Sequence, residues 1–458
     1  MKVCKFGGTS LANAEQIKKV CQIILNDETR KLIVVSAPGK RYKEDTKVTD
    51  LLILFGTKQI EQGRAEDKLQ RVIDRYAEIA DELQLPSTCI ERITTDLKVL
   101  LQWDGEDKDA FLDMVKAAGE DNCAKLVTEY LFKLGAKATY INPKDAGLLV
   151  SGQFGNAQVL PEAYERLAEL REKDGLLVFP GFFGYTPEGE LVTFSRGGSD
   201  VTGSILAAAV KAEQYENFTD VDSVYAVNPN LVPNPCEIKE ITYREMRELS
   251  YAGFSVFHEE ALIPAFRAGI PVCIKNTNNP TAPGTKIVEK RTQTSQIVAG
   301  IASDSGFCSI YVSKYLMNKE IGFGRKLLQI LEDENISYEH SPSGIDDITV
   351  ILRQHQLDAK KEVRIINRIK NELNVDDIHV VYNMALVMMV GEGMRQSVGV
   401  TARAANALAE AGINIEMINQ GSSEVNLMFG VKAVDADHAV IALYQEFYNK
   451  EEVPVGIC

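Results

Sequence analysis

The sequence predicts an α/β protein in which a mainly parallel sheet is covered by helices and is followed by two smaller α+β repeats. Residues 31–37 read Lys-Leu-Ile-Val-Val-Ser-Ala, an apolar run typical of a buried parallel strand. Strand-like and helix-like segments alternate through the first two thirds of the chain, as α/β folds require. The last third repeats a strand–helix–strand–strand (βαββ) pattern with a period of 79 residues, from Asn335-Ile to Asn414-Ile.

The composition is that of a globular protein, and it excludes several classes of function. The 458 residues are 45% hydrophobic and 25% charged, and a chain of this length should form about two to four domains. The net charge of −15 argues against binding to nucleic acid or to an anionic membrane, which needs a basic surface. Eight cysteines without a CxxC pair indicate neither a zinc site nor a disulfide framework. Without a signal peptide or an apolar run of about 18 residues, we expect a cytoplasmic protein.

The first ten residues predict an anion-binding turn. Residues 3–6 have the composition of a short strand, two glycines at 7 and 8 interrupt it, and a helix is expected from Asn13. Glycines let the backbone approach an oxyanion closely, and the dipole of the following helix attracts it. Lys5 would add a full positive charge. The alternative is an ordinary first strand with an exposed lysine.

A second glycine-rich turn lies at residues 194–200, Phe-Ser-Arg-Gly-Gly-Ser-Asp. It closes a predicted hairpin and opens a helix, so it repeats the combination of glycines, a cation and a helix N-terminus. Arg196 suits a carboxylate, because a guanidinium binds both oxygens. Asp200 would either cap the helix or orient Lys5 or a metal ion.

Acidic residues complete the candidate site. Glu120 stands at a predicted helix start, where a carboxylate caps favourably; its functional partner would be the amino group of a substrate. Asp220 and Asp222 follow a predicted strand, at the strand end where α/β sheets bind ligands. They would hold magnesium or a nucleotide, or else they are solvated turn residues. Neither the dinucleotide fingerprint nor the GxxxxGK[ST] phosphate loop is present.

The spacing of apolar residues predicts the remaining elements. A helical insertion is expected at about 64–135, at one edge of the sheet, and Thr242 with Glu245 has the spacing of a capping box. Strands are predicted at 139–141, 148–150, 176–179, 191–194, 215–219 and 270–274. Helices are predicted at 161–172, 199–211, 242–251 and 256–268. A linker is expected near 292–294.

Together these stretches resemble the aspartokinases, members of the amino-acid kinase family with tandem ACT domains at the carboxy terminus. The matching motifs stand in the family's order at 5–10 (KFGGTS), 36–37, 49–50, 119–120, 194–200 and 219–220. The resemblance implies the amino-acid kinase fold for residues 1–293 and ACT domains at 294–378 and 379–458, the last segment returning to pair with the first ACT domain. It implies ATP, as MgATP, and L-aspartate as substrates, and 4-phospho-L-aspartate as product. This is the first step towards lysine, threonine and methionine, with feedback by lysine or threonine.

The resemblance also implies a role for each matching residue. Lys5 would contact the transferring phosphoryl group, and Asp200 would orient Lys5. Aspartate would be held by Ser36, Thr49, Glu120, Arg196, Gly197, Gly198 and Ser199, with Glu120 on its amino group and Arg196 on its α-carboxylate. ATP would be held by Lys5, Gly7, Gly8, Thr9, Thr219, Asp220, Tyr225, Asn228, Asn230 and Ser255. The candidate effector contacts are Met317, Phe323, Tyr338, Glu339, Ser343 and Asp346. No residue is assigned to a protein-bound metal.

Two positions depart from the commoner family pattern and remove positive charge from the nucleotide end. Many relatives have a lysine where this chain has Ser255, and Asp-Pro-Arg where it has Asn228-Pro-Asn230. Lys275 or Lys40 would have to substitute. These departures keep two alternatives open: a kinase for another small amino acid, and an ACT ligand sensor without catalysis. Because isolated βαββ sheets have open edges, we expect a homodimer or homotetramer formed through the ACT domains.

Overall fold

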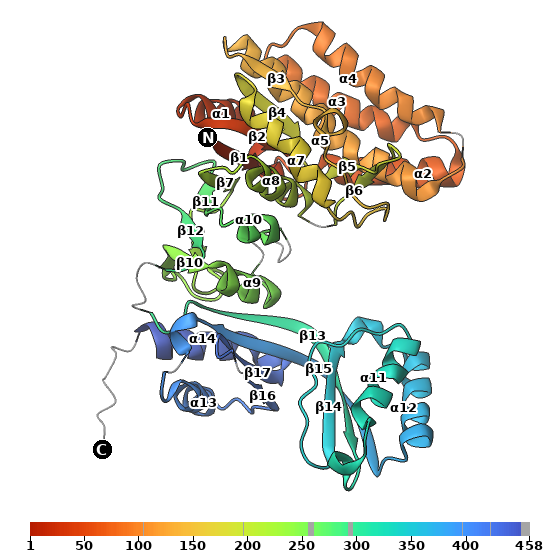
Figure 1. Ribbon diagram of the computed structural model, residues 1–458, viewed down its shortest axis with the longest axis vertical. Helices are drawn as coiled ribbons and strands as arrows, with labels where there is room; N and C mark the ends of the chain where they lie inside the picture. The colour runs from red at the N-terminus through yellow and green to blue at the C-terminus, as the bar shows by residue number, and fades with distance from the viewer. Residues whose placement is uncertain are drawn as a thin grey trace. The chain divides into compact units, whose positions relative to one another are not determined.

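The computed structural model describes residues 1–103, 105–195, 197–254, 261–291, 296–395, 397–421 and 423–449 (Figure 1). Its contacts divide the chain into two units. The first consists of residues 1–224, 237–247 and 255–292, and the second of residues 225–236, 248–254 and 293–458. Two short segments from the first two thirds of the chain therefore pack with the C-terminal unit.

The first unit is built on an eight-stranded sheet with the strand order β10-β12-β11-β7-β1-β2-β4-β3. The strands are β1 (Lys2–Phe6), β2 (Arg30–Val35), β3 (Ala138–Tyr140), β4 (Leu176–Pro180), β7 (Gln214–Thr219), β10 (Glu240–Thr242), β11 (Val272–Asn276) and β12 (Thr285–Val288). Every neighbouring pair is parallel except β11 with β12. The predicted mainly parallel sheet is confirmed.

Helices connect and cover these strands. They are α1 (Ala14–Leu25), α2 (Val48–Gln62), α3 (Glu66–Glu82), α4 (Ser87–Val99), α5 (Lys108–Lys133), α6 (Pro143–Ala146), α7 (Pro161–Ala168), α8 (Gly198–Ala209) and α10 (Ile263–Arg267). Helix α9 (Tyr243–Tyr251) belongs to the first unit up to Arg247 and to the second unit from Glu248. Asn13 caps α1 by accepting a hydrogen bond from the N–H of Gln16. The predicted capping box of α9 is confirmed, because Thr242 and Glu245 exchange side chain–backbone bonds in both directions.

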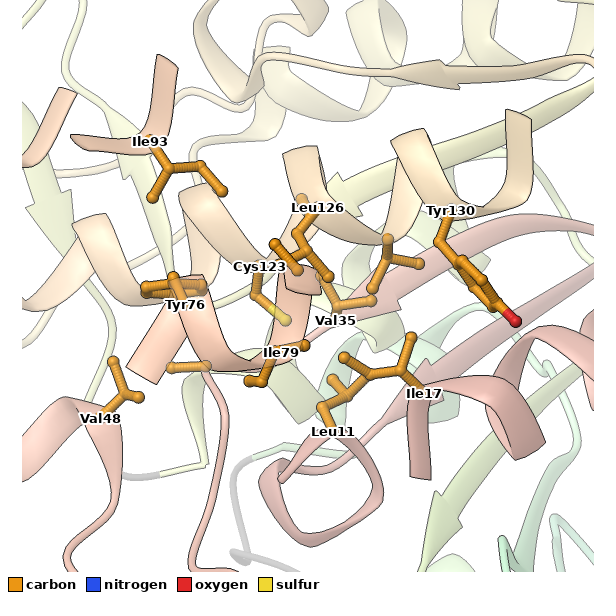
Figure 2. Close-up of a cluster of buried hydrophobic side chains, with 14 of the residues drawn as sticks. Leu11, Ile17, Val35, Val48, Tyr76, Ile79, Ile93, Cys123, Leu126 and Tyr130 are labelled. Atoms are coloured by element: carbon orange, nitrogen blue, oxygen red, sulfur yellow. The ribbon is translucent and has the colours of Figure 1, made fainter. Parts of the chain in front are cut away.

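One apolar cluster packs the five helices from α1 through α5 against one face of the sheet (Figure 2). It includes Ile17, Val35, Val48, Tyr76, Ile79, Ile93, Cys123, Leu126 and Tyr130. The buried Tyr76 hydroxyl donates to the carbonyl of Gly119 at 2.6 Å. A β-carbon at Gly119 would lie only 2.8 Å from that of Ala37, so glycine lets α5 approach the end of β2. This contact fixes the position of the next residue on α5, Glu120.

Successive side chains of β1 point to opposite faces of the sheet. Cys4 and Phe6 belong to the apolar cluster, whereas Lys5 pairs with Asp200 on α8. In register, Lys5 lies between Val34 of β2 and Asn217 of β7. The first strand therefore contributes apolar packing to one face and a buried cation to the other.

Three predicted elements differ from those observed. Residues 148–150 form only isolated bridges, from Leu149 to Tyr185 and from Val150 to Val159, because so short an apolar run packs equally well outside a strand. The predicted helix at 161–172 tightens into a 3₁₀ turn after Ala168. Of the helix predicted at 256–268, residues 263–267 form α10, and residues 255–260 lie outside the described part. The predicted hairpin is formed by β5 (Phe183–Tyr185) and β6 (Leu191–Thr193).

The second unit has a five-stranded antiparallel sheet with the order β14-β13-β15-β17-β16. Its strands are β13 (Gly300–Ser313), β14 (Asp347–Arg353), β15 (Asp377–Val390), β16 (Met417–Asn419) and β17 (Asn426–Lys432), and its helices are α11 (Phe323–Asp333), α12 (Ala359–Leu373), α13 (Val400–Glu410) and α14 (Ala436–Tyr444). Strands β14 and β17 begin and end 79 residues apart, so the repeat found in the sequence is a repeat of structure. Within the described residues, no helix combines the length and apolarity needed to cross a membrane.

Candidate active site

A cavity of about 420 Å³ opens in the first unit where β1 and β2 end and α8 begins. Its lining includes eight of the predicted site residues, namely Lys5, Ser36, Thr49, Glu120, Gly197, Gly198, Ser199 and Asp200. These residues come from segments far apart in the chain, and the parallel sheet brings their strand ends to one edge. The remaining lining residues are Lys47, Ile53, Lys116, Gly155, Phe182, Thr193, Phe194 and Ser195.

The ammonium of Lys5 is held by a carboxylate at the start of α8. Its Nζ lies 2.6 Å from Oδ1 of Asp200, and Lys5 is only 7% exposed. Asn217, the neighbour of Lys5 on β7, donates from Nδ2 to the same oxygen at 2.6 Å. Two donors from adjacent strands therefore fix Asp200, and Asp200 in turn fixes the direction of the lysine side chain.

Glu120 is a buried carboxylate whose hydrogen bonds are incomplete. Burial raises the pKa of its carboxyl group to about 7, and the N–H of Ala37 and the charges of Lys47 and Lys5 oppose that rise. Among the described residues, its Oε2 has no hydrogen-bond partner. Because an unsatisfied buried carboxylate is costly, the site favours a ligand that brings a positively charged donor.

Glycines bring the backbone turns around the cavity close together. A β-carbon at Gly39 would lie 2.5 Å from the carbonyl carbon of Gly8, so a side chain at Gly39 would push the first glycine turn away. Gly197, at the N-cap of α8, has φ +75°, a left-handed conformation that glycine adopts without strain. Both turns of the predicted site thus depend on glycine for their geometry.

The predicted nucleotide-binding residues of the first unit lie along neighbouring strand ends. The N–H of Gly7 donates to the carbonyl of Phe218 on β7 at 3.1 Å, so this N–H is used within the sheet. Gly8 and Thr9 begin a 3₁₀ helix, where the first N–H groups have no partner within the helix. Thr219 ends β7 and bonds the adjacent Asp220 at 3.3 Å.

Several predicted residues fall elsewhere. Arg196 and Ser255 lie outside the described residues. Tyr225, Asn228 and Asn230 belong to the second unit, where the N–H of Asn230 donates to the side chain of Asn228 at 2.9 Å. Their roles stay predictions.

The six candidate effector contacts occupy different environments within the second unit. Met317 and Phe323 are buried in its apolar cluster, and Tyr338 is exposed. Glu339 accepts hydrogen bonds from Tyr251 and Arg353, and Asp346 accepts one from the N–H of Leu316. Ser343 lines a cavity of about 370 Å³ together with Asp347 and Thr349.

Sequence reasoning missed two lysines and the carboxylate that holds one of them. Lys47 and Lys116 line the cavity, whereas Lys40, one of the predicted substitute cations, is exposed and bonds the carbonyl of Lys43. Asp113 is 1% exposed and contacts Lys116. The predicted helix start at Glu120 is wrong, because Glu120 lies in the middle of α5, one helical turn after Lys116, so both residues belong to one face of that helix. The helical pattern expected at about 64–135 was the signal that could have paired them.

No group of three or more His, Cys, Asp or Glu side chains is placed to hold a metal ion in the described part of the chain. Three lysines, Lys5, Lys47 and Lys116, line the cavity and suit anions.

Comparisons with known proteins agree with this geometry. A model of the amino acid kinase family matches residues 1–276, and an ACT domain model matches residues 387–447. The chain is 62% identical to aspartokinase 3 of Bacillus subtilis (strain 168) over 98% of this chain and 99% of that protein. The crystal structure of Clostridium acetobutylicum aspartate kinase matches with a TM-score of 0.85 and 40% identity, covering 98% and 100% of the two chains.

E. coli aspartokinase III matches in two crystallised states. Its complex with aspartate and ADP (R-state) gives a TM-score of 0.80 at 26% identity, covering 98% of this chain and all of that chain. Its complex with lysine and aspartate (T-state) gives 0.76 at 26% identity, covering 98% and 99%.

The fold and the family matches define a kinase of the amino-acid kinase type, joined to an ACT-containing unit. The match extends over both units and over nearly the full length of the relatives. The chain belongs to the aspartokinases, and its reaction is the ATP-dependent phosphorylation of the side-chain carboxylate of L-aspartate.

Proposed function

We propose that L-aspartate binds in the 420 Å³ cavity with its amino group on Glu120 and its side-chain carboxylate facing Lys5. The observation that carries this proposal is the buried carboxylate of Glu120, which has one oxygen without a partner among the described residues. An α-ammonium group supplies both the positive charge and the N–H donors that this oxygen lacks.

Lys5 stabilises the charge of the reacting groups. The nucleophile is a carboxylate with a reference pKa of about 3.9, so it is ionised at neutral pH and needs no general base. The obstacle is the repulsion between this anion and the phosphates, which fixed cations and N–H groups offset while they align the groups. Asp200 and Asn217 hold the ammonium of Lys5 in place, so it need not reorganise during transfer.

MgATP would lie along the ends of β1 and β7, with its phosphates near Gly8, Thr9 and Lys5. These positions combine N–H groups at a helix start with a cation, which is the chemistry that binds phosphate. Mg²⁺ would enter as part of this substrate and neutralise charge on the phosphoryl oxygens. Thr219 and Asp220 would contact the nucleotide at the end of β7.

The second unit would bind an amino-acid effector and join two copies of the chain. E. coli aspartokinase III was crystallised with lysine in its T-state, and lysine or threonine is the corresponding proposal here. Residues 1–293 would form the catalytic domain, and residues 294–378 and 379–458 the two ACT domains. Inhibition assays with each amino acid, alone and together, identify the effector, and light scattering measures the number of copies.

The activity is tested by trapping the acyl phosphate. With L-aspartate, MgATP and hydroxylamine, the purified chain should form aspartyl hydroxamate and ADP in equal amounts. A panel of other small amino acids tests whether aspartate is the preferred acceptor. Binding of lysine or threonine without any consumption of ATP would instead identify a non-catalytic sensor and overturn the proposal.

A further inference from the structure

The active-site cavity contains a lysine for which the family motifs provide no role. Lys116 lies on α5 and lines the cavity together with Glu120. The two residues are four positions apart, so their side chains leave the same face of the helix about one turn apart. One helix thus presents an anchored cation and a buried carboxylate to the same cavity.

A buried carboxylate fixes Lys116 in this position. Oδ1 of Asp113 lies 3.0 Å from Nζ of Lys116. Its other oxygen, Oδ2, accepts hydrogen bonds from the N–H groups of Gly155 and Thr193, both at 2.8 Å. Asp113 therefore ties the lysine to two backbone segments that also line the cavity.

The lysine retains donors for a ligand. An ammonium has three N–H donors, and the contact with Asp113 uses one of them. Thr193, whose N–H also bonds Asp113, lines the same cavity, and its buried hydroxyl has no hydrogen-bond partner among the residues that the structure describes. A cation and a hydroxyl in one cavity, from two residues that are both bonded to one carboxylate, are suited to binding a carboxylate group.

We propose that Lys116 binds the α-carboxylate of the substrate while Glu120 binds its α-ammonium group. This inference depends on the proposed placement of L-aspartate. Both groups are bonded to one carbon atom, so two adjacent turns of α5 reach both of them. The helix then recognises the α-amino-acid end of the substrate, and the side-chain carboxylate is left facing Lys5. Lys116 is thus a specificity-determining residue, which adds to the cation that the resemblance assigns to Arg196.

A merely structural role, in which Lys116 only neutralises Asp113, makes a different prediction. The two roles are distinguished by measuring each Lys116 variant with two substrates, one with the α-carboxylate and one without it. L-aspartic acid α-amide keeps the amino group and the side-chain carboxylate but lacks the α-carboxylate charge. A lysine that binds this charge discriminates between the two substrates, and a lysine that only supports the fold does not.

The experiment compares wild type, Lys116→Met, Lys116→Arg and Lys125→Met with both substrates. Lys116→Met keeps most of the aliphatic stem, and Lys116→Arg restores a cation. Lys125→Met is the matched control, because Lys125 lies on the same helix and pairs with Asp121 at 2.7 Å. Each variant is first checked by thermal unfolding, and kcat/KM and a calorimetric Kd are then measured.

Lys116→Met should lower kcat/KM for L-aspartate by about 10- to 100-fold, which corresponds to one charge-assisted hydrogen bond. The same change should alter kcat/KM for the α-amide less than about threefold and leave the KM for ATP unchanged. Lys116→Arg should recover most of the loss, and Lys125→Met should behave as wild type. The calorimetric Kd values should follow the same pattern.

An equal loss with both substrates, or no loss with L-aspartate, would overturn the role of Lys116. A wild-type chain that makes no aspartyl hydroxamate would instead contradict the proposed function. In that case the Kd values still test Lys116, because they report binding without turnover.

Discussion

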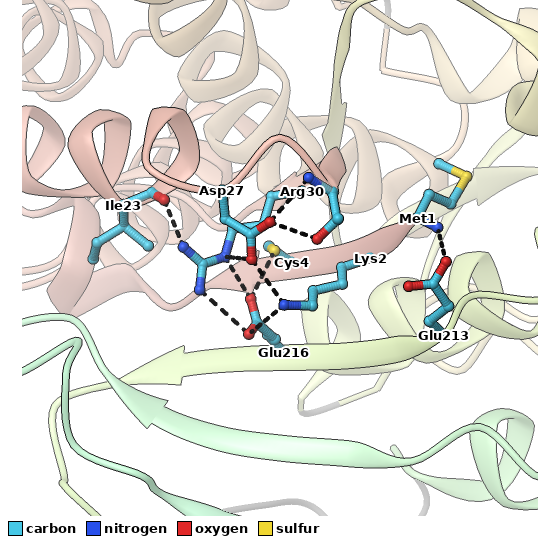
Figure 3. Close-up of polar contacts among 9 residues, drawn as sticks. Met1, Lys2, Cys4, Ile23, Asp27, Arg30, Glu213 and Glu216 are labelled. Atoms are coloured by element: carbon cyan, nitrogen blue, oxygen red, sulfur yellow. Dashed lines mark hydrogen bonds and ion pairs between the residues drawn. The ribbon is translucent and has the colours of Figure 1, made fainter.

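Two clusters of charged side chains lie on opposite faces of the same strands. On the face of the sheet toward α8, called the α8 face, Lys5 pairs with Asp200, and Asn217 donates a hydrogen bond to the same carboxylate. On the α1 face, Arg30 pairs with Glu216 at 2.6 Å (Figure 3). Because Glu216 and Asn217 are successive residues of β7, the alternation of the strand sends one side chain to each cluster.

The two clusters differ in what surrounds them. Glu216 accepts bonds from Arg30 and from the thiol of Cys4, and Lys2 lies 3.8 Å from its second oxygen. Arg30 also donates to the carbonyl of Ile23 (Figure 3). Burial raises the pKa of the Cys4 thiol well above its usual value, so Cys4 stays a protonated donor.

The cluster around Lys5 instead borders the cavity in which Glu120 has an unpartnered oxygen. We therefore expect similar residue types to support structure in one place and ligand binding in the other. What distinguishes the two is that the cluster around Lys5 borders an open cavity, where the neighbouring Glu120 has an incomplete set of partners. The comparison predicts that variants on the α1 face change stability, and that variants on the cavity side change activity.

The largest effect is expected for Arg30→Ala, which leaves the buried carboxylate of Glu216 without its main partner. Removing one member of a buried ion pair typically costs about 3–5 kcal/mol. Urea unfolding should show this loss, while kcat of the protein that remains folded stays near wild type. Lys19→Ala is the control: its pair with Glu15 is solvent-exposed, so it should cost less than about 1 kcal/mol. A fall in kcat without a loss of stability would contradict the structural role of Arg30.

Lys5→Ala should give the largest change in activity. Loss of a fixed cation at the transferring phosphoryl group should lower kcat by about 10² or more, as measured by hydroxamate formation. Near-normal turnover would show that the cavity is not the site of phosphoryl transfer.

Glu120→Gln keeps the shape of the side chain and removes its charge. The KM for L-aspartate should rise about tenfold or more, because a charge-assisted bond to the substrate amino group is lost. The KM for ATP should stay within about twofold. A variant with an unchanged KM for aspartate would place the amino group elsewhere.

The pH dependence of aspartate binding should be a smaller effect of the same carboxylate. Burial raises the pKa of Glu120 to about 7, and only its ionised form pairs with an ammonium group. Below about pH 7 the Glu120 carboxyl group is protonated and must lose this proton before the substrate binds. The value of kcat/KM for aspartate should therefore decrease as the pH is lowered, by up to about tenfold for each pH unit. Glu120→Gln should remove this dependence. A wild-type profile that stays flat between about pH 5.5 and 7.5 would contradict it.

The sequence was most informative where residues with a common chemical role lie close together in the chain. Lys5, Glu120 and Asp200 were identified from motifs, and the capping box at Thr242 was identified from spacing alone. The structure brings these three motif residues to one cavity. Their roles in the reaction stay predictions.

Long-range pairing was not visible in the sequence. The contact of Asp113 with Thr193 spans 80 residues, and Lys5 and Asn217 meet at the same oxygen of Asp200 because β7 pairs with β1 in a particular register. Residues 148–150 have strand-like composition, yet they form only isolated bridges. Such features depend on which segments meet in space, and local spacing does not encode that.

A crystal structure of the chain with L-aspartate and a non-hydrolysable ATP analogue tests the central claim most directly. The account predicts the α-amino nitrogen about 3 Å from the Glu120 carboxylate, with the substrate's other end turned towards the ammonium of Lys5. Aspartate bound outside this cavity, or bound in it with the amino group turned away from Glu120, would contradict the account.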